Sequence, residues 1–454
     1  MNDFSLKDDA EHTQDHLLAL TDALEAGGLV QVRRMLNHLP APTIAHLLES
    51  SPSPTREVLW KLVDRENEGE VLNYLNIDLQ ADILTKLSPA EVATLTAGLD
   101  TDDRADILQA LPEQVIQQVL GAMRDQDRKR LETVLSYPED SAGGLLNTDT
   151  ITVRRNHSVE VVLRYLRRHD EIPEMTDSLW VVDRNDHLVG VLALRKLLVS
   201  DPETTVQDIM ETDFEAIPVS MDQQDVANRF ERMDWVSAPV VDDAGKLLGR
   251  ITIDDIVDVI REETDHSIKS MAGLGDDEDT FAPVVRTLRN RVVWLGINLS
   301  MAFLASLVIN QFSQTIDQVV ALAVLMTVVA NMGGVAGNQT LTLVVRSMAL
   351  GQVGRANAWW LLQREVSVGI LNGLLLAGLG GLIAHWWFSD SLLSMLFASA
   401  LIINMITAAL SGAALPLLMK SFGIDPALAG SMALTTITDS VGFLSFLGLA
   451  SLFY

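Results

Sequence analysis

The sequence predicts a multidomain protein with an all-α superhelical N-terminal domain, an α/β middle region and a transmembrane domain of five α-helices. Three observations predict this fold class. A short helical pattern repeats near the start, a strand–turn–strand–helix pattern occurs twice in the middle, and five long uncharged stretches fill the last part. We therefore expect domains at residues 1–140, 141–260 and 291–454, with a connecting helix at 261–290.

Charge is divided unevenly along the chain. The formal net charge is −28, and residues 291–454 hold five acidic and five basic residues, so the whole excess lies in residues 1–290. Such a negative field attracts cations and disfavours nucleic acid, although acidity that serves only solubility is an alternative. The chain has no cysteine, which leaves hard, oxygen-coordinated cations as the expected metals.

The N-terminal domain is expected to be a stack of short helices. ADILTKLSPAEVATL, from Ala81, is echoed by ADILQALPEQVIQQVL, from Ala105, at an offset of 24 residues. This repetition predicts a small right-handed stack of helix pairs. The polar, acidic start at residues 1–12 lacks the layout of a signal peptide, so we expect this domain in the cytoplasm.

Two similar segments make up the middle region. WVVDRNDHLVGVLALRKLL, from Trp180, aligns with PVVDDAGKLLGRITIDDIV, from Pro239, at an offset of 59 residues. Each segment predicts a strand, a turn, a second strand and a helix. The pair resembles tandem cystathionine-β-synthase-type (CBS) domains, and this resemblance implies that they bind ATP or another adenine nucleotide.

The same resemblance implies which copy binds the nucleotide. CBS domains use a G-x-x-T-x-x-D segment for the ribose and phosphates, and the second copy has it as Gly249, Thr252 and Asp255. The first copy has alanine and lysine in place of the threonine and the aspartate. Nucleotide binding is therefore expected at the second copy rather than at the first.

Acidic residues crowd the helix that follows the second copy. Asp255, Asp258, Glu262 and Asp265 lie at spacings of three, four and three, so they share one helix face. Like charges so placed destabilise an isolated helix by roughly 0.2–0.5 kcal/mol per pair. A solvated face is the ordinary explanation, but a cation-bridged face is favoured because this helix leads directly to the membrane.

Five stretches with almost no formal charge predict membrane spans, because each exceeds the roughly 20 residues needed to cross a bilayer. They cover residues 292–312, 318–345, 366–388, 392–419 and 428–453. Basic residues precede the first span (Arg286, Arg289, Arg291), separate spans two and three (Arg346, Arg355, Arg364) and separate spans four and five (Lys420). This alternation places the N-terminal part in the cytoplasm and Tyr454 outside, across a cytoplasmic (inner) membrane.

One carboxylate is expected in the middle of the last span. Asp439 lies in TTITDSVGFL, close behind Thr435, Thr436 and Thr438. A charge at that depth costs several kcal/mol unless it faces water, a partner or an ion. A protonated or hydrogen-bonded structural aspartate is the alternative.

Span two contains a second unusual segment, MGGVAGNQTLT, which includes Gly337, Asn338 and Gln339. Its three glycines are expected to weaken the helix and free backbone carbonyls, which survive at this depth only beside protein or a water-filled path. A close contact between helices through small residues is the alternative. Together with Asp439, this segment indicates an oxygen-lined path suited to a hydrated divalent cation.

A single carboxylate makes a poor pore, so we expect a two-fold homodimer that brings two copies of Asp439 to one axis. Mg²⁺ suits a wide site reached through water, because it loses its waters reluctantly. The residues alone do not separate Mg²⁺ from Co²⁺, Ni²⁺ or Mn²⁺.

Several motifs together resemble the MgtE family of Mg²⁺ channels. They are the junction YPEDSAGGLLNTDTITV, the segment GGVAGNQ, the loop GIDPAL and the stretch TTITDSVG. The resemblance implies a homodimer with one pore, in which Asp439 is the key pore carboxylate and Gly337, Asn338 and Gln339 line the path. It also implies that Mg²⁺ bound among the cytoplasmic domains and the connecting helix stabilises the closed pore.

The resemblance, with the acidic face of the connecting helix, implies candidate regulatory metal ligands in the helical domain, the second CBS copy, the connecting helix and the GIDPAL loop. They are Asp102, Asp106, Asp234, Asp255, Asp258, Glu262, Glu263, Asp265 and Asp425. The chain departs from the family pattern at Val335, where asparagine is usual, and at His266 and Ser267, where an acidic pair is usual.

Three other functions are alternatives to cation transport. Asp439 and the lack of an intramembrane basic residue disfavour an anion channel. A signalling receptor without transport would leave Asp439 and GGVAGNQ as packing elements. An enzyme is disfavoured because the sequence has no nucleophile elbow, P-loop or metal-ligand cluster.

Overall fold

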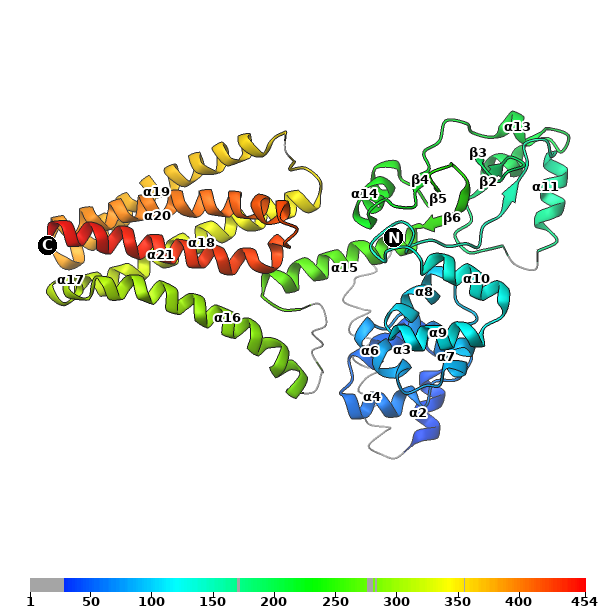
Figure 1. Ribbon diagram of the computed structural model, residues 1–454, viewed down its shortest axis with the longest axis horizontal. Helices are drawn as coiled ribbons and strands as arrows, with labels where there is room; N and C mark the ends of the chain where they lie inside the picture. Colours follow the sequence, from blue (N-terminus) through cyan, green and yellow to red (C-terminus); the bar gives the residue numbers. More distant parts are fainter. Residues whose placement is uncertain (1–27, 170–171, 276–280, 282–283, 355) are drawn as a thin grey trace, which may run out of the picture. The chain divides into compact units, whose positions relative to one another are not determined.

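The computed structural model describes residues 28–169, 172–275, 281, 284–354 and 356–454 (Figure 1). These residues form two compact units, one running to Glu262 and the other holding the rest of the helix that crosses Glu263 and all the long apolar helices. The acidic start at residues 1–12 and Arg355 lie outside the described residues, as does the side chain of Arg286.

The N-terminal part of the first unit is built from short helices. They are α2 (Leu29–Leu36), α3 (Ala41–Glu49), α4 (Ser53–Trp60), α5 (Glu68–Asn73), α6 (Ile77–Leu84), α7 (Pro89–Leu95), α8 (Thr101–Gln109), α9 (Glu113–Ala122) and α10 (Asp125–Val134). The pair α6–α7 recurs as α8–α9 at the predicted offset of 24 residues. Side-chain caps fix two of these starts, since Asn76 accepts from the amide of Leu79 and Ser88 forms a capping box with Glu91.

Two α/β copies complete the first unit, as the repeat predicts. The first contains β1 (Thr152–Val153), α11 (Val159–Leu166), β2 (Ser178–Val182), β3 (Leu188–Ala193) and α12 (Leu194–Val199), and the second contains α13 (Val206–Ile209), β4 (Ile217–Pro218), α14 (Gln223–Met233), β5 (Ser237–Val241) and β6 (Leu247–Thr252). In each copy a parallel pair is extended by an antiparallel strand, in the orders β1-β2-β3 and β4-β5-β6. The second copy shares one apolar core with the helical domain, whereas the first has its own.

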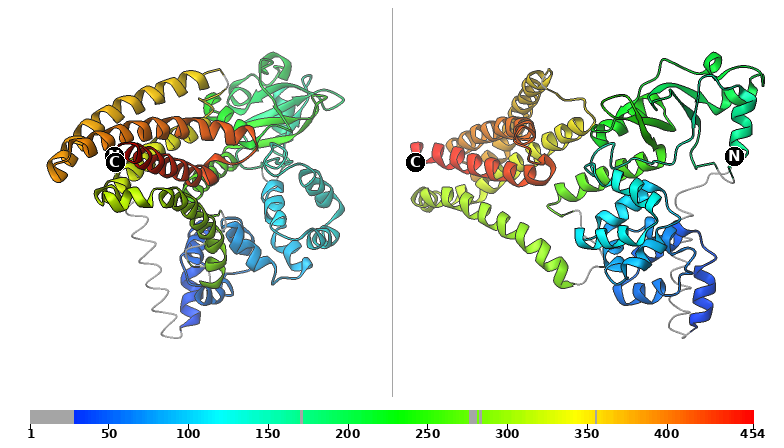
Figure 2. Two further views of the ribbon diagram at one scale, coloured as in Figure 1. Left: turned by 60° about the vertical axis from the view of Figure 1, so that its left-hand side comes forward. Right: turned by 45° about the vertical axis from the view of Figure 1, so that its right-hand side comes forward.

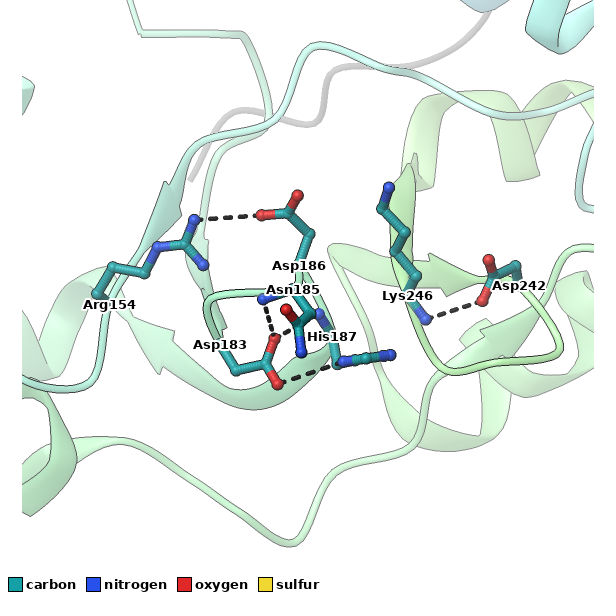
Figure 3. Close-up of polar contacts among 7 residues, drawn as sticks. All are labelled: Arg154, Asp183, Asn185, Asp186, His187, Asp242 and Lys246. Atoms are coloured by element: carbon teal, nitrogen blue, oxygen red, sulfur yellow. Dashed lines mark hydrogen bonds and ion pairs between the residues drawn. The ribbon is translucent and has the colours of Figure 1, made fainter.

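The β-turns of the two copies lie against each other (Figure 3). The amide of Leu188 donates to the carbonyl of Gly245, and the amide of Leu247 donates to the carbonyl of Asp186, at 3.1 and 3.0 Å. Asp186 and Gly245 are equivalent in the 59-residue repeat, and both have positive φ. The two copies therefore pair through equivalent turns, which fixes the position of β6 and the helix that follows it.

The second unit contains the long apolar helices. After the end of α15 (Ile253–Met271) come α16 (Val284–Gln311), α17 (Ser313–Gln318), α18 (Ala321–Ala349), α19 (Ala358–Phe388), α20 (Ser391–Ser421) and α21 (Pro426–Phe453). Five of them are long and apolar enough to cross a membrane, which confirms the five predicted spans. Helices α18, α20 and α21 pack against one another, α19 packs on α20, and α16 packs on α21 (Figures 1 and 2).

Tryptophans mark both ends of α19. Trp359 and Trp360 are exposed at its start, and Trp386 and Trp387 are exposed near its end. At 1.5 Å per residue the two pairs lie about 40 Å apart along the helix, close to the thickness of a bilayer with its headgroups. Aromatic belts of this kind are typical of the two membrane interfaces.

The expectation of a weakened helix in MGGVAGNQTLT is wrong, because α18 is continuous through this segment. The glycines instead allow close approach of neighbouring helices, which was the alternative. A Cβ at Gly333 would lie 2.2 Å from the amide of Asn404 in α20, and one at Gly337 would lie 2.9 Å from Leu434 in α21. The segment keeps its backbone bonds and uses its small residues for packing.

Candidate functional site

Asp439 lies within the span of α21 and is partly exposed in the single chain. No side chain among the described residues donates a hydrogen bond to its carboxylate. The hydroxyl of Thr435, one turn earlier on the same face and exposed, donates to the carbonyl of Ser431 at 2.9 Å. The hydroxyl oxygen of Thr435 therefore keeps free lone pairs. Helix α21 thus offers this hydroxyl and the Asp439 carboxylate to a ligand or partner outside the chain.

Helix α18 supplies the other candidate path residues. Gly337 is buried against α21, whereas Asn338 and Gln339 are exposed. Because α18 and α21 pack together, the pore candidates of the two motifs lie on neighbouring helices. The structure thus brings the two helices together and leaves the amide, hydroxyl and carboxylate groups accessible.

Glu365 is a second carboxylate inside a span, and sequence reasoning placed it just outside. It lies in α19 with a side chain 6% exposed, accepts a hydrogen bond from Thr340 of α18 at 3.3 Å, and pairs with Arg364. The adjacent charge of Arg364 in QREV favoured placing Glu365 in the loop before the span. Nothing in the local sequence predicted its hydrogen bond with Thr340. Glu365 is satisfied within the chain, unlike Asp439.

Three aspartates on α8 form the first part of an acidic group in the first unit. Asp102 is 4% exposed and its Oδ1 has no hydrogen-bond partner among the described residues. Burial, with the charges of Asp255 and Asp103, raises its pKa well above the usual range. Loss of water and the neighbouring charges also raise the pKa of Asp103 to about 6 and that of Asp106 to about 8.

The first turns of α15 supply the second part of this group. Burial and the charge of Asp254 raise the pKa of Asp255 to about 7, and burial also raises the pKa of Asp258. The charge of Glu262 is among those that raise the pKa of Asp106. Asp102 and Asp106 on α8 are therefore close enough to Asp255 and Glu262 on α15 for their charges to interact. Asp103 and Asp254, which the sequence analysis did not single out, belong to the same group.

The group is crowded but does not form a closed coordination shell. Among the described residues, no three acidic or histidine side chains converge to hold an ion directly. Asp234 ends α14 as an exposed residue in the left-handed region, with φ of 51°. A cation held here would keep part of its hydration shell, which suits Mg²⁺.

The end of α15 meets the start of α21 in the second unit. His266 Nε2 lies 3.0 Å from Asp425 Oδ2, while Asp425 Oδ1 caps α21 by accepting from the amide of Ala427 at 2.9 Å. Met271 packs beside Leu341 and Leu434. Asp425 therefore joins two helices, and Glu263 and Asp265 lie in the same helix as His266, partly exposed and exposed respectively.

The nucleotide segment of the second copy is ordered by its own contacts. Thr252 donates its hydroxyl to Asp255 at 2.9 Å, and a Cβ at Gly249 would lie 2.4 Å from the carbonyl of Asn147. In the first copy Lys196 pairs instead with Glu211 at 3.1 Å. Asp255 thus belongs both to the candidate nucleotide segment and to the acidic group.

Comparison with known proteins shows to which family this chain belongs. Family models match residues 326–449 as MgtE, a divalent cation transporter, residues 39–140 as the MgtE intracellular N domain, and residues 142–202 and 206–262 as CBS domains. The magnesium transporter MgtE of Thermus thermophilus is 32% identical over 442 residues, which cover 96% of this chain and 98% of the relative. The chain belongs to the MgtE family.

Other members and structures agree. The MgtE of Bacillus subtilis is 28% identical, over 97% of this chain and 98% of its own. The cytosolic domain of the Mg²⁺ channel MgtE in complex with ATP is 33% identical with a TM-score of 0.50, covering 54% of this chain and 99% of that one. MgtE membership confirms the predicted fold class, and the chain is a multi-pass membrane protein of this magnesium-transporter family.

Proposed function

We propose that this chain is a Mg²⁺-selective channel or transporter that imports Mg²⁺ across the cytoplasmic membrane. The proposal depends on one observation about Asp439, which lies within a membrane span. Its carboxylate has no partner among the described side chains. A charge kept at that depth without a partner is expected to face water or an ion. Two relatives named as magnesium transporters support Mg²⁺ as the cargo.

The conducting form is proposed to be a homodimer, with the helical and CBS domains in the cytoplasm. A single chain presents one carboxylate and one exposed threonine on α21, too few oxygens for a divalent ion. A two-fold axis beside α21 doubles this set. Hydrated Mg²⁺ would then meet the Asp439 and Thr435 oxygens through its own waters, and Co²⁺, which forms a similar hydrated ion, is the expected competitor.

Closure by cytoplasmic Mg²⁺ is proposed to act through α15. Without cations, the charges on α8 and on the start of α15 are expected to repel one another, because burial and then neighbouring carboxylates raise the pKa values of Asp106 and Asp255. Mg²⁺ shared by these carboxylates would hold α15 in one position. The same helix carries His266, which contacts Asp425 at the start of α21, so α15 is the proposed link between sensor and path.

Adenine nucleotide is proposed to bind the second CBS copy. The relative solved with ATP supports this assignment, and Thr252 and Asp255 are the residues that would hold it. Since Asp255 also belongs to the acidic group, a nucleotide there would change how that group binds Mg²⁺.

Uptake into proteoliposomes tests the transport proposal. Purified wild-type protein should admit Mg²⁺, and Asp439→Ala should abolish uptake while reconstituting equally well. Glu365→Gln is a matched control, because it also removes an intramembrane charge but keeps an acceptor for Thr340. Wild-type rates in the Asp439 variant would overturn the proposal, and competition by Co²⁺, Ni²⁺ and Ca²⁺ would give the ion ranking.

A further inference from the structure

Asn404 lies near the middle of α20 and is fully buried among apolar residues. Its Nδ2 donates to the backbone carbonyl of Val329 in α18 at 2.7 Å. Its Oδ1 is buried as well and has no hydrogen-bond partner among the described residues. Packing alone does not explain this side chain, because an apolar residue would fill the space without leaving a polar atom unpaired.

Two glycines make room for this amide, one on each neighbouring helix. A Cβ at Gly333 of α18 would lie 2.2 Å from Asn404 Nδ2, and a Cβ at Gly442 of α21 would lie 2.9 Å from the same atom. Distances this short leave no space for any side chain at either position. The amide of Asn404 therefore lies wedged between α18 and α21 and sets how closely they approach.

Both neighbouring helices carry candidate path residues next to this wedge. Gly333 is one helical turn before Gly337 and the exposed Asn338. Gly442 is three residues after Asp439 in α21, a rise of about 4.5 Å along the helix. A change in the separation of α18 and α21 at Asn404 would therefore move both helices within about one turn of the candidate path residues Asn338 and Asp439.

We infer that Asn404 is a positioning residue that sets the separation of α18 and α21 and, through it, the width of the ion path at Asp439. The inference rests on the proposed function. Removing the amide lets the two helices close together, and a narrower path penalises the ion that gives up its waters least readily. Mg²⁺ should therefore lose more than Ca²⁺, which is larger and is held by more flexible sets of ligands.

The test measures the ratio of Mg²⁺ to Ca²⁺ uptake in proteoliposomes. Asn404→Ala should lower this ratio by about fivefold or more, in the range typical of coupling between sites. Ser394→Ala is the matched control. Ser394 is also a buried polar residue of α20, but among the described residues its hydroxyl bonds only to the carbonyl of Asp390 at the start of the same helix. The ratio is informative because a purely structural defect would reduce the amount of active protein and leave the ratio unchanged.

A compensating pair sharpens the test. In Gly333→Ala/Asn404→Ala a methyl group occupies part of the space that the amide leaves, so the ratio should move back toward wild type. If Asn404→Ala does not assemble, Gly442→Ala presses on the same amide from α21 and should shift the ratio. An unchanged ratio in the variant that assembles would overturn the inference, whereas failure of the wild type to admit Mg²⁺ would overturn the proposed function instead.

Discussion

The two intramembrane carboxylates show how single residues divide structural and ion-contacting roles. Glu365 is buried and bonded to Thr340 and Arg364, so its charge is balanced inside one chain. Asp439 is partly exposed and has no such partner among the described residues. Because an unbalanced carboxylate is costly in a membrane, Asp439 is the residue expected to meet the cation.

Gly337 and Gly334 give a matched pair for testing packing on α18. A side chain at Gly337 would press on Leu434 at about 3 Å, whereas a Cβ at Gly334 would meet nothing within 4 Å. Gly337→Val should therefore stop uptake, since a β-branched side chain cannot fit without moving α21. Gly334→Ala should be tolerated and should raise helix stability by up to about 1 kcal/mol.

Uptake and thermal unfolding of the two variants in the same detergent check this prediction. Equal uptake by Gly337→Val and wild type would show that the contact with α21 does not shape the path. A loss of uptake in Gly334→Ala would place a second contact surface there.

Sequence reasoning found Asp439 because a charge in an apolar stretch is visible locally. It missed Asn404 and the partner of Glu365 for a physical reason. The role of Asn404 depends on Gly333, 71 positions earlier in the chain, and on Gly442, 38 positions later. No spacing rule within one helix brings these residues together, whereas the three-helix packing does.

The pairing of α8 with the start of α15 is the element on which regulation is proposed to depend. Asp102 and Asp106 were expected from the resemblance to the MgtE family, and the structure adds Asp103, whose pKa is also raised by burial. The expectation for the glycine segment of α18 was wrong, because a weakened helix was predicted and the helix is continuous. Glycine weakens an isolated helix, but packing against α20 and α21 outweighs that preference.

Acidification should stabilise the pairing of α8 with the start of α15, as a bound cation is proposed to do. Asp103, Asp255 and Asp106 have pKa values of about 6, 7 and 8 in the folded chain, above the value near 4 of an unfolded aspartate. The folded arrangement binds more protons, so its stability is fully present below about pH 4 and is lost as the pH rises through 6 to 8. Mg²⁺ should restore the arrangement at pH 8.

Spin labels can measure this response in the full chain, because it has no native cysteine. Labels at the exposed residues Gln114 and Val257 should give a broad distance distribution at pH 8 without divalent ions. The distribution should narrow at pH 5.5 or with Mg²⁺. Asp102→Asn/Asp106→Asn should be narrow under all conditions, and a wild-type distribution that ignores both pH and Mg²⁺ would contradict the account.

The whole molecule is proposed to work as two copies around an axis beside α21. The lack of cysteine allows a direct test, in which Thr435→Cys is oxidised in the membrane. A cross-linked dimer is expected, because Thr435 is exposed on the single chain beside Asp439. Leu382→Cys, exposed on α19, should not cross-link, and the reverse pattern would place the axis on another helix.

The central claim is that this chain conducts Mg²⁺ and is closed by it, and open probability in patch-clamp recording tests it most directly. Wild-type open probability should fall as cytoplasmic Mg²⁺ rises, whereas Asp255→Asn/Asp258→Asn should remain open at concentrations that close the wild type. Glu203→Gln/Asp213→Asn, which removes two exposed charges elsewhere, should follow the wild type. If wild type and the Asp255/Asp258 variant give the same curve, the acidic group on α8 and α15 is not the sensor.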